Sequence, residues 1–119
     1  MRTIIAGSRT VNDYALVERA VADSGFILTE VVSGMARGVD TLGERWAAEH
    51  GVPVDRKPAD WKTYGRRAGY LRNVEMAEYA AAGEGPGQLV AIWENGSRGT
   101  AHMIRLAREH GLDVFVVEI

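Results

Sequence analysis

The chain has 119 residues, of which 46% are hydrophobic and 25% are charged. These are ordinary values for one globular domain, and they exclude a collagen-like, coiled-coil or disordered chain. The absence of cysteine excludes disulfides and thiolate metal sites. No apolar run approaches the roughly 18 residues of a transmembrane helix, and the first apolar stretch is too short for a signal peptide. We therefore expect a cytoplasmic protein with no membrane contact.

The charge balance argues against a nucleic-acid partner. The formal net charge is −2, whereas a nucleic-acid surface is broadly basic. Of the fourteen basic residues only Lys57 and Lys62 are lysine, and the rest are arginine. Arginine is suited to bidentate contacts with phosphate and carboxylate groups. The alternative explanation of this bias is the base composition of the genome.

The first half of the chain alternates strand and helix patterns. An apolar run predicts a strand at residues 3–6, and apolar residues at helical spacing predict a helix at 13–24. Asn12 or Asp13 would cap this helix and Gly25 would end it. A second strand is expected around residues 31–32. A second helix is expected at 38–50.

The second half continues the alternation. A short strand at residues 52–54 is expected near a sheet edge, because Pro53 lacks a backbone donor. Residues 56–66 suggest a long loop. The remaining pattern predicts a helix at 67–82, a strand at 89–93, a helix at 99–110 and a strand at 114–117.

This order of elements defines a fold class. Alternating strands and helices favour a parallel sheet with helices on both faces. Right-handed crossovers leave few topologies, and we expect a Rossmann-like, doubly wound, five-stranded parallel sheet of order 3-2-1-4-5. We expect one domain over residues 1–119, with Trp46 and Trp93 in its core. In such sheets ligands bind beyond the carboxyl ends of the strands, where the strand order reverses.

Three glycine-containing loops follow predicted strands, at residues 7–10, 33–40 and 94–100. Glycine lets backbone N–H groups approach a ligand, and a helix N-terminus favours an anion. Each loop alone is typical of a turn and helix cap, but each also carries an arginine. The spacing matches neither a dinucleotide-binding fingerprint nor a Walker motif. The candidate ligand-binding residues are Gly7, Ser8, Arg9, Ser33, Gly34, Arg37, Gly38, Gly96, Ser97, Arg98, Gly99 and Thr100.

A second candidate segment, residues 59–73, combines aromatic, basic and amide side chains. Trp61 or Tyr64 would stack on a base, and Arg72 would hold a phosphate. Asp60 and Asn73 complete the candidates for ligand binding. The alternative is that the aromatic residues anchor a long loop to the core.

Carboxyl groups are the candidates for acid–base chemistry. Glu94 ends a strand at the predicted cleft, and Asp40 begins a helix, where it would stabilise the helix even without a catalytic role. Asp60 and Glu75 are further carboxylates, and His102 is expected to be a surface or capping residue. No metal-ligand spacing or nucleophile triad is evident, so we expect neither a metal nor a cofactor.

Together these segments resemble the SLOG superfamily, most closely its small stand-alone YspA, cpYpsA-related branch. The resemblance covers nearly the whole chain, and residues 33–40 are also similar to the core motif of the DNA-processing protein DprA/Smf. As a set these motifs are specific. They are residues 6–9, 33–40, 59–61, Arg72-Asn73 with Met76, and 96–100.

The resemblance implies a Rossmann-like domain that binds nucleotides or their derivatives and commonly forms a homodimer. Relatives called lonely guy are phosphoribohydrolases, which cleave the base from a nucleoside monophosphate. These relatives have an arginine before the strand that leads into their phosphate loop, and it corresponds to Arg72. Their phosphate loop corresponds to Gly96, Gly99 and Thr100. Their catalytic glutamate falls on Met103, which has no acid–base capacity. Hydrolysis here would require a carboxylate from elsewhere.

Three hypotheses follow. The first is a nucleotide-binding or sensing domain. The second is an N-glycosidase, in which Arg72, Asp40 and Glu94 would be the catalytic residues. The third is a nucleic-acid or protein interaction module, against which the net negative charge counts.

Overall fold

The computed structural model describes residues 1–94 and 96–119, and strands alternate with helices along it. Asn95, within the third glycine-containing loop, lies outside the described residues. The elements in chain order are β1 (Arg2–Gly7), α1 (Tyr14–Ser24), β2 (Glu30–Ser33), α2 (Val39–Glu49), β3 (Val54–Arg56), α3 (Trp61–Tyr64), the 3-10 helix η1 (Gly65–Arg67), α4 (Ala68–Ala81), β4 (Gln88–Trp93), α5 (Arg98–Glu109) and β5 (Asp113–Glu118).

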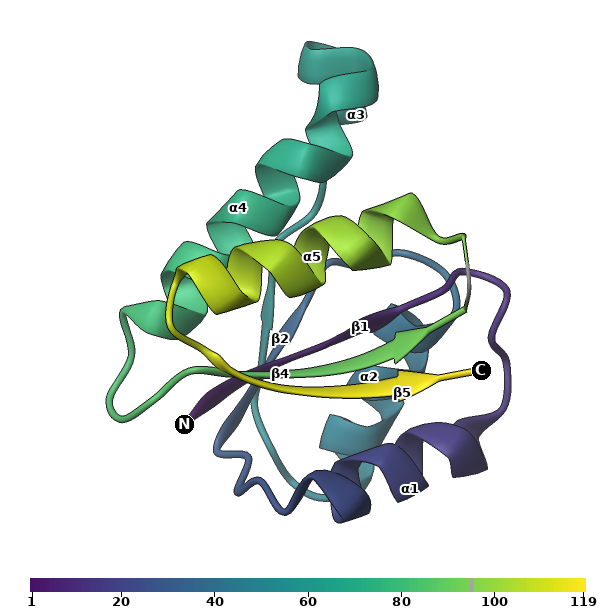
Figure 1. Ribbon diagram of the computed structural model, residues 1–119, viewed down its shortest axis with the longest axis vertical. Coiled ribbons are helices and arrows are strands. Elements are labelled where there is room, and N and C mark those ends of the chain that lie inside the picture. The colour runs from purple at the N-terminus through teal and green to yellow at the C-terminus, as the bar shows by residue number, and fades with distance from the viewer. Residues whose placement is uncertain (95) are drawn as a thin grey trace.

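The five strands form one parallel sheet of order β3-β2-β1-β4-β5, which confirms the predicted fold class. The chain leaves β1 toward β2 and β3, then crosses back to β4 and β5. Right-handed crossovers in the two directions place helices on opposite faces. Accordingly α1 and α2 cover one face, and α4 and α5 cover the other (Figure 1). The strand order reverses between β1 and β4.

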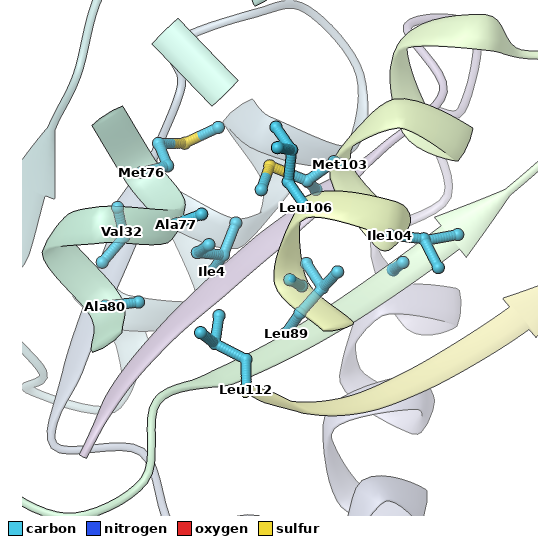
Figure 2. Close-up of a cluster of buried hydrophobic side chains, with 13 residues drawn as sticks. Ile4, Val32, Met76, Ala77, Ala80, Leu89, Met103, Ile104, Leu106 and Leu112 are labelled. Carbon is cyan, nitrogen blue, oxygen red and sulfur yellow. The ribbon is translucent and has the colours of Figure 1, made fainter. Parts of the chain in front are cut away.

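The sheet is buried on both faces, which explains its continuous apolar strands. Ile4 and Leu89 pack under α4 and α5, against Met76 and Met103 of those helices (Figure 2). On the other face Ile5 and the neighbouring strand residues pack against α1 and α2. The predicted core tryptophans, Trp46 and Trp93, are only partly buried and pack at the margins of these two clusters.

Local signals place α1 as predicted. The carboxylate of Asp13 accepts a hydrogen bond from the N–H of Ala15 at 3.1 Å, which caps the helix. Gly25 ends it with a φ of 70°, in the left-handed region that glycine adopts without strain.

Two predicted boundaries were wrong. Strand β3 lies at the sheet edge, as expected, but begins at Val54 rather than at residue 52. The N–H of Val52 is used by the end of α2, where it donates to Ala47 O, and Pro53 has no N–H to give. The expected loop at 56–66 contains α3 and the start of η1.

Helix α3 escaped prediction because it buries none of its residues and so has no apolar periodicity. Its start is held by the carboxylate of Asp60, which accepts a hydrogen bond from the N–H of Thr63 at 3.1 Å. Helix α3 and the beginning of α4 project beyond the sheet (Figure 1). Within the described part of the chain, every helix is too short or too polar to cross a membrane.

Candidate functional site

A cavity of about 470 Å³, here called cavity 1, opens at the carboxyl ends of β1 and β4. This is the reversal point of the strand order, where doubly wound sheets bind ligands. Its walls come from the β1–α1 loop, the loop before α2, helix α4 and the start of α5. The lining residues are Ala6, Gly7, Ser8, Arg9, Thr10, Ala36, Asp40, Arg72, Asn73, Met76, Glu94, Gly96, Ser97, Gly99, Thr100 and Met103.

The end of β1 requires glycine because three backbone segments meet there. A Cβ atom on Gly7 would lie 2.3 Å from the carbonyl oxygen of Ile92, which no side chain can tolerate. Gly38, with a φ of 77°, passes so close to Ser8 that a Cβ would lie 2.3 Å from its carbonyl oxygen. The same oxygen accepts a hydrogen bond from the N–H of Val39 at 3.3 Å. The loop after β1 and the start of α2 are therefore held together.

The N-terminus of α5 forms one wall of cavity 1. The first N–H groups of a helix have no intrahelical acceptor and carry its positive dipole end. Ser97, the N-cap residue, makes no capping bond with its side chain, and its hydroxyl instead lies 3.0 Å from that of Thr100. No described residue accepts a hydrogen bond from the N–H groups of Arg98, Gly99 or Thr100. This wall can accept an anion.

Helix α4 brings two neighbouring polar residues to the opposite wall, the partly buried Arg72 and the buried Asn73. Arg72 donates through Nη1 to the carbonyl oxygen of Gly34 and through Nε to Oδ1 of Asn73, the latter at 3.1 Å. Asn73 in turn lies 3.1 Å from Nδ1 of His102 and donates to the carbonyl of Gly99 at 3.3 Å. This chain of bonds links the loop before α2 to the start of α5.

Burial lowers the pKa values of two basic side chains beside this wall. The first is Arg72, where the negative charge of Asp40 opposes the shift. Burial also lowers the pKa of His102, which was expected at the surface but is half-buried, with its ring edge against Tyr70.

Asp40 is the buried carboxyl group of cavity 1. It lies in the first turn of α2, is only 5% exposed, and accepts a hydrogen bond from the N–H of Ala36 at 3.3 Å. Burial raises the pKa of Asp40 to about 6, against the opposing effect of Arg72 and Arg9. At neutral pH the site thus holds a carboxylate that has lost most of its hydration.

Glu94 provides the second carboxyl group, at the exposed mouth of the same cavity. Its Oε2 accepts a hydrogen bond from the hydroxyl of Thr10 at 2.5 Å, and its N–H donates to the hydroxyl of Ser8 at 3.1 Å. These contacts tie the end of β4 to the β1–α1 loop.

A second cavity of about 370 Å³, cavity 2, adjoins the first and shares Arg9, Ala36 and Arg72 with it. Trp61, 50% exposed, forms an aromatic wall, and the guanidinium of Arg9 lies 5.8 Å from its ring centroid. Met35 has a φ of 61°, in the left-handed region that is uncommon for residues other than glycine. The full lining is Arg9, Gly34, Met35, Ala36, Arg37, Pro58, Ala59, Trp61 and Arg72.

Four arginines of this rim form no ion pair with any residue that the structure describes. Five ion pairs join described residues, and none of them includes Arg9, Arg37, Arg72 or Arg98. A chain with a net negative charge therefore concentrates unpaired positive charge at one edge of its sheet. The described residues hold no cluster of three or more His, Cys, Asp or Glu side chains suited to a metal ion.

The structure brings most of the sequence candidates together. Six of the candidates line neither cavity: Ser33, Gly38, Asp60, Tyr64, Glu75 and Arg98. Ser33 donates to Glu44 at 2.6 Å, while Gly38 and Asp60 shape the backbone as described above. Arg98 is exposed at the first position of α5.

Sequence reasoning missed Thr10, whose hydroxyl orients Glu94, and Pro58 in cavity 2. Met76 and Met103 also line cavity 1, and the family resemblance had pointed to both, Met76 as part of a motif and Met103 at the position of the catalytic glutamate. The helical spacing of these two apolar residues signals by itself only that they are buried.

Comparison with known proteins matches the first part of this architecture to a family. Residues 1–64 match the model of the YspA, cpYpsA-related SLOG family, YAcAr. The matched segment contains the loop after β1, the loop before α2, and Trp61. The chain is also 37% identical to the Gene 61 protein of Mycobacterium phage D29, over 95% of this chain and 93% of the relative. No solved structure matches the chain. The chain therefore belongs to the YspA, cpYpsA-related SLOG family.

Proposed function

We propose that the chain binds a nucleotide or nucleotide-derived ligand, with a phosphate group at the N-terminus of α5. Membership in the SLOG family suggests a nucleotide-related ligand or a glycosidase-like role. The volume of cavity 1, about 470 Å³, is within the range of small-molecule sites. The observation that carries the proposal is one cavity bounded by a helix N-terminus without a side-chain cap and by two arginines, Arg9 and Arg72, that form no ion pair among the described residues.

The second cavity suits the base of such a ligand. Trp61 presents an aromatic surface to it, and the shared lining joins it directly to cavity 1. Stacking of a base on an aromatic ring contributes about 1–3 kcal/mol to binding. In this arrangement Arg9 and Arg72 lie between the base and the phosphate.

Isothermal titration calorimetry with the four nucleoside 5′-monophosphates tests the proposal. Arg9 is exposed and pairs with no acidic group, so Arg9→Ala should leave the fold intact while weakening binding about tenfold or more, as expected for a charged hydrogen bond to phosphate. Arg105→Ala is the matched control, because Arg105 is an exposed arginine of α5 that lines neither cavity. Equal affinities in the two variants would contradict the proposal.

Gly99→Val provides an independent test at the other wall. A Cβ on Gly99 would meet no described atom within 4 Å beyond its chain neighbours and its own helix, so we expect valine to be tolerated by the fold while it fills the anion-binding end of α5. We expect it to abolish binding without lowering the melting temperature by more than a few degrees. Retained affinity would place the phosphate elsewhere.

The alternative activity is N-glycosidic cleavage of the same ligand. It is favoured by one observation, that the carboxyl groups of Asp40 and Glu94 line the same cavity as Arg72. In this reaction water adds to C1′ of the sugar and the base leaves with a proton. A carboxylate would stabilise the positive charge at C1′, which Met103 cannot do. Chromatography of protein incubated with each nucleotide would show free base and ribose phosphate, and loss of both products in Asp40→Asn or Glu94→Gln would assign the carboxylate.

A further inference from the structure

Asp40 has an oxygen that the fold leaves without a donor. Its Oδ2 accepts from the N–H of Ala36, whereas no described residue donates to its Oδ1. Its side chain lines cavity 1 although the residue is 5% exposed, and Oδ1 is not sealed from solvent. Buried carboxylates normally have their hydrogen bonds satisfied. The donor to Oδ1 therefore comes from the cavity, as water or as a ligand that displaces the water.

The charges around Asp40 show which donor this can be. Arg72 on α4 and Arg9 in the β1–α1 loop are attractive, and Glu44 on α2 is repulsive. Neither arginine is within the 4.0 Å of an ion pair with Asp40, because Arg72 donates to Gly34 and Asn73 instead. A phosphate would be repelled by the carboxylate. A neutral hydroxyl group would not, and it can donate a hydrogen bond to Oδ1.

The position of Asp40 matches the middle of a nucleotide. A Cβ on Gly34, which lines cavity 2, would lie 2.8 Å from Oδ2 of Asp40 and 2.7 Å from Nη1 of Arg72. Asp40 thus lies at the wall between the two cavities, with the anion-binding end of α5 in one and Trp61 in the other. In a nucleotide the ribose lies between phosphate and base.

From this geometry we infer that the ligand is a ribonucleotide and that Asp40 recognises its ribose hydroxyl groups. The inference rests on the nucleotide site proposed above and names its substrate class. A site built to bond a hydroxyl discriminates strongly against the analogue that lacks it, because the protein group is then left unpaired. Asp40 is accordingly the residue that separates ribonucleotides from deoxyribonucleotides.

Calorimetric titration with each nucleoside 5′-monophosphate and its 2′-deoxy and 3′-deoxy counterparts tests the inference. At about pH 7.5 the wild-type protein should bind the ribonucleotide about tenfold to a hundredfold more tightly than at least one deoxy form. Asparagine at position 40 keeps an oxygen for the N–H of Ala36 but removes the charge. Asp40→Asn should therefore reduce the preference to about threefold or less.

The control is Glu44→Gln, which neutralises a neighbouring carboxylate of the same helix that lines neither cavity. It should retain the wild-type preference. In the wild type the preference should shrink at about pH 5, below the raised pKa of Asp40, because a protonated carboxyl accepts hydrogen bonds less well.

The outcomes separate the two proposals. Binding of all forms with equal affinity, or a preference that survives in Asp40→Asn, refutes the role of Asp40 while the nucleotide site stands. A dependence on the amino group of the base that disappears in Asp40→Asn would assign the residue to the base and also refute the inference. Absence of binding by every nucleotide refutes the proposed function, and the inference with it.

Discussion

Replacing Asp40 with asparagine should stabilise the folded protein at neutral pH. Burial raises the pKa of Asp40 from 3.8 to about 6, so the folded state binds this proton more tightly than the unfolded state does. A difference of about two pH units corresponds to about 3 kcal/mol, which is the upper limit of the gain. For a domain of this size the melting temperature would rise by about 10 °C.

The direction of the pKa shift determines how the stability difference between the two proteins changes with pH. Because the pKa is raised on folding, the contribution of Asp40 to stability is fully present below its unfolded value of 3.8 and is lost as the pH rises through about 6. The wild type and Asp40→Asn should therefore be equally stable at about pH 4. The variant should gain its advantage between about pH 4 and 6 and keep it at higher pH.

Urea denaturation followed by circular dichroism across this range measures the difference. Asp23→Asn is the control, since Asp23 is an exposed carboxylate of α1, and it should change stability by less than about 0.5 kcal/mol at every pH. A variant that is no more stable than the wild type at about pH 7.5, or an advantage that does not diminish toward pH 4, would refute the reasoning. A buried charge that lowers the stability of the folded protein is typical of a functional site.

Three further substitutions test the site, two through the stability of the fold and one through ligand binding. Gly7→Ala should lower the free energy of unfolding by about 3 kcal/mol, because its Cβ would meet the backbone at Ile92, and an unchanged urea midpoint would contradict this. Met103→Ala should cost about 2–5 kcal/mol in the same measurement, since Met103 is 1% exposed and packs in the core; a cost below about 1 kcal/mol would show that it is not needed there. Trp61→Ala should change stability by less than about 1 kcal/mol yet weaken nucleotide binding about tenfold in calorimetry. Unaltered affinity in that variant would remove Trp61 from the site.

The arrangement of strands and helices was predictable because its signals are local. The apolar run of β4, the cap at Asp13 and the glycine after α1 are each read within a few residues, and alternation of elements then restricts the topology. Prediction failed at β3 and α3. At β3 the N–H of Val52 bonds to Ala47 at the end of α2, a contact that the apolar pattern of residues 52–54 does not reveal. Helix α3 packs no face against the core and so has no apolar pattern to read.

The site was predictable as a set of loops but not as an arrangement of atoms. The rule for doubly wound sheets places the ends of β1 and β4 at one edge, and so brings residues 7–10 near Glu94 and residues 96–100. Nothing local shows that Arg72 reaches across to Gly34, or that Asn73 bonds to Gly99 at the start of α5.

The amino-acid sequence by itself thus determined the fold, the family and the edge of the sheet where the glycine loops gather. Periodicity, capping residues and turn residues act over a few positions, and so they can be read along the chain. Only the tertiary structure decided that Asp40 is buried beside two arginines without pairing with either, and that Ser33 turns away to Glu44. Burial and hydrogen-bond partners depend on which elements meet, and those contacts join residues far apart in the chain.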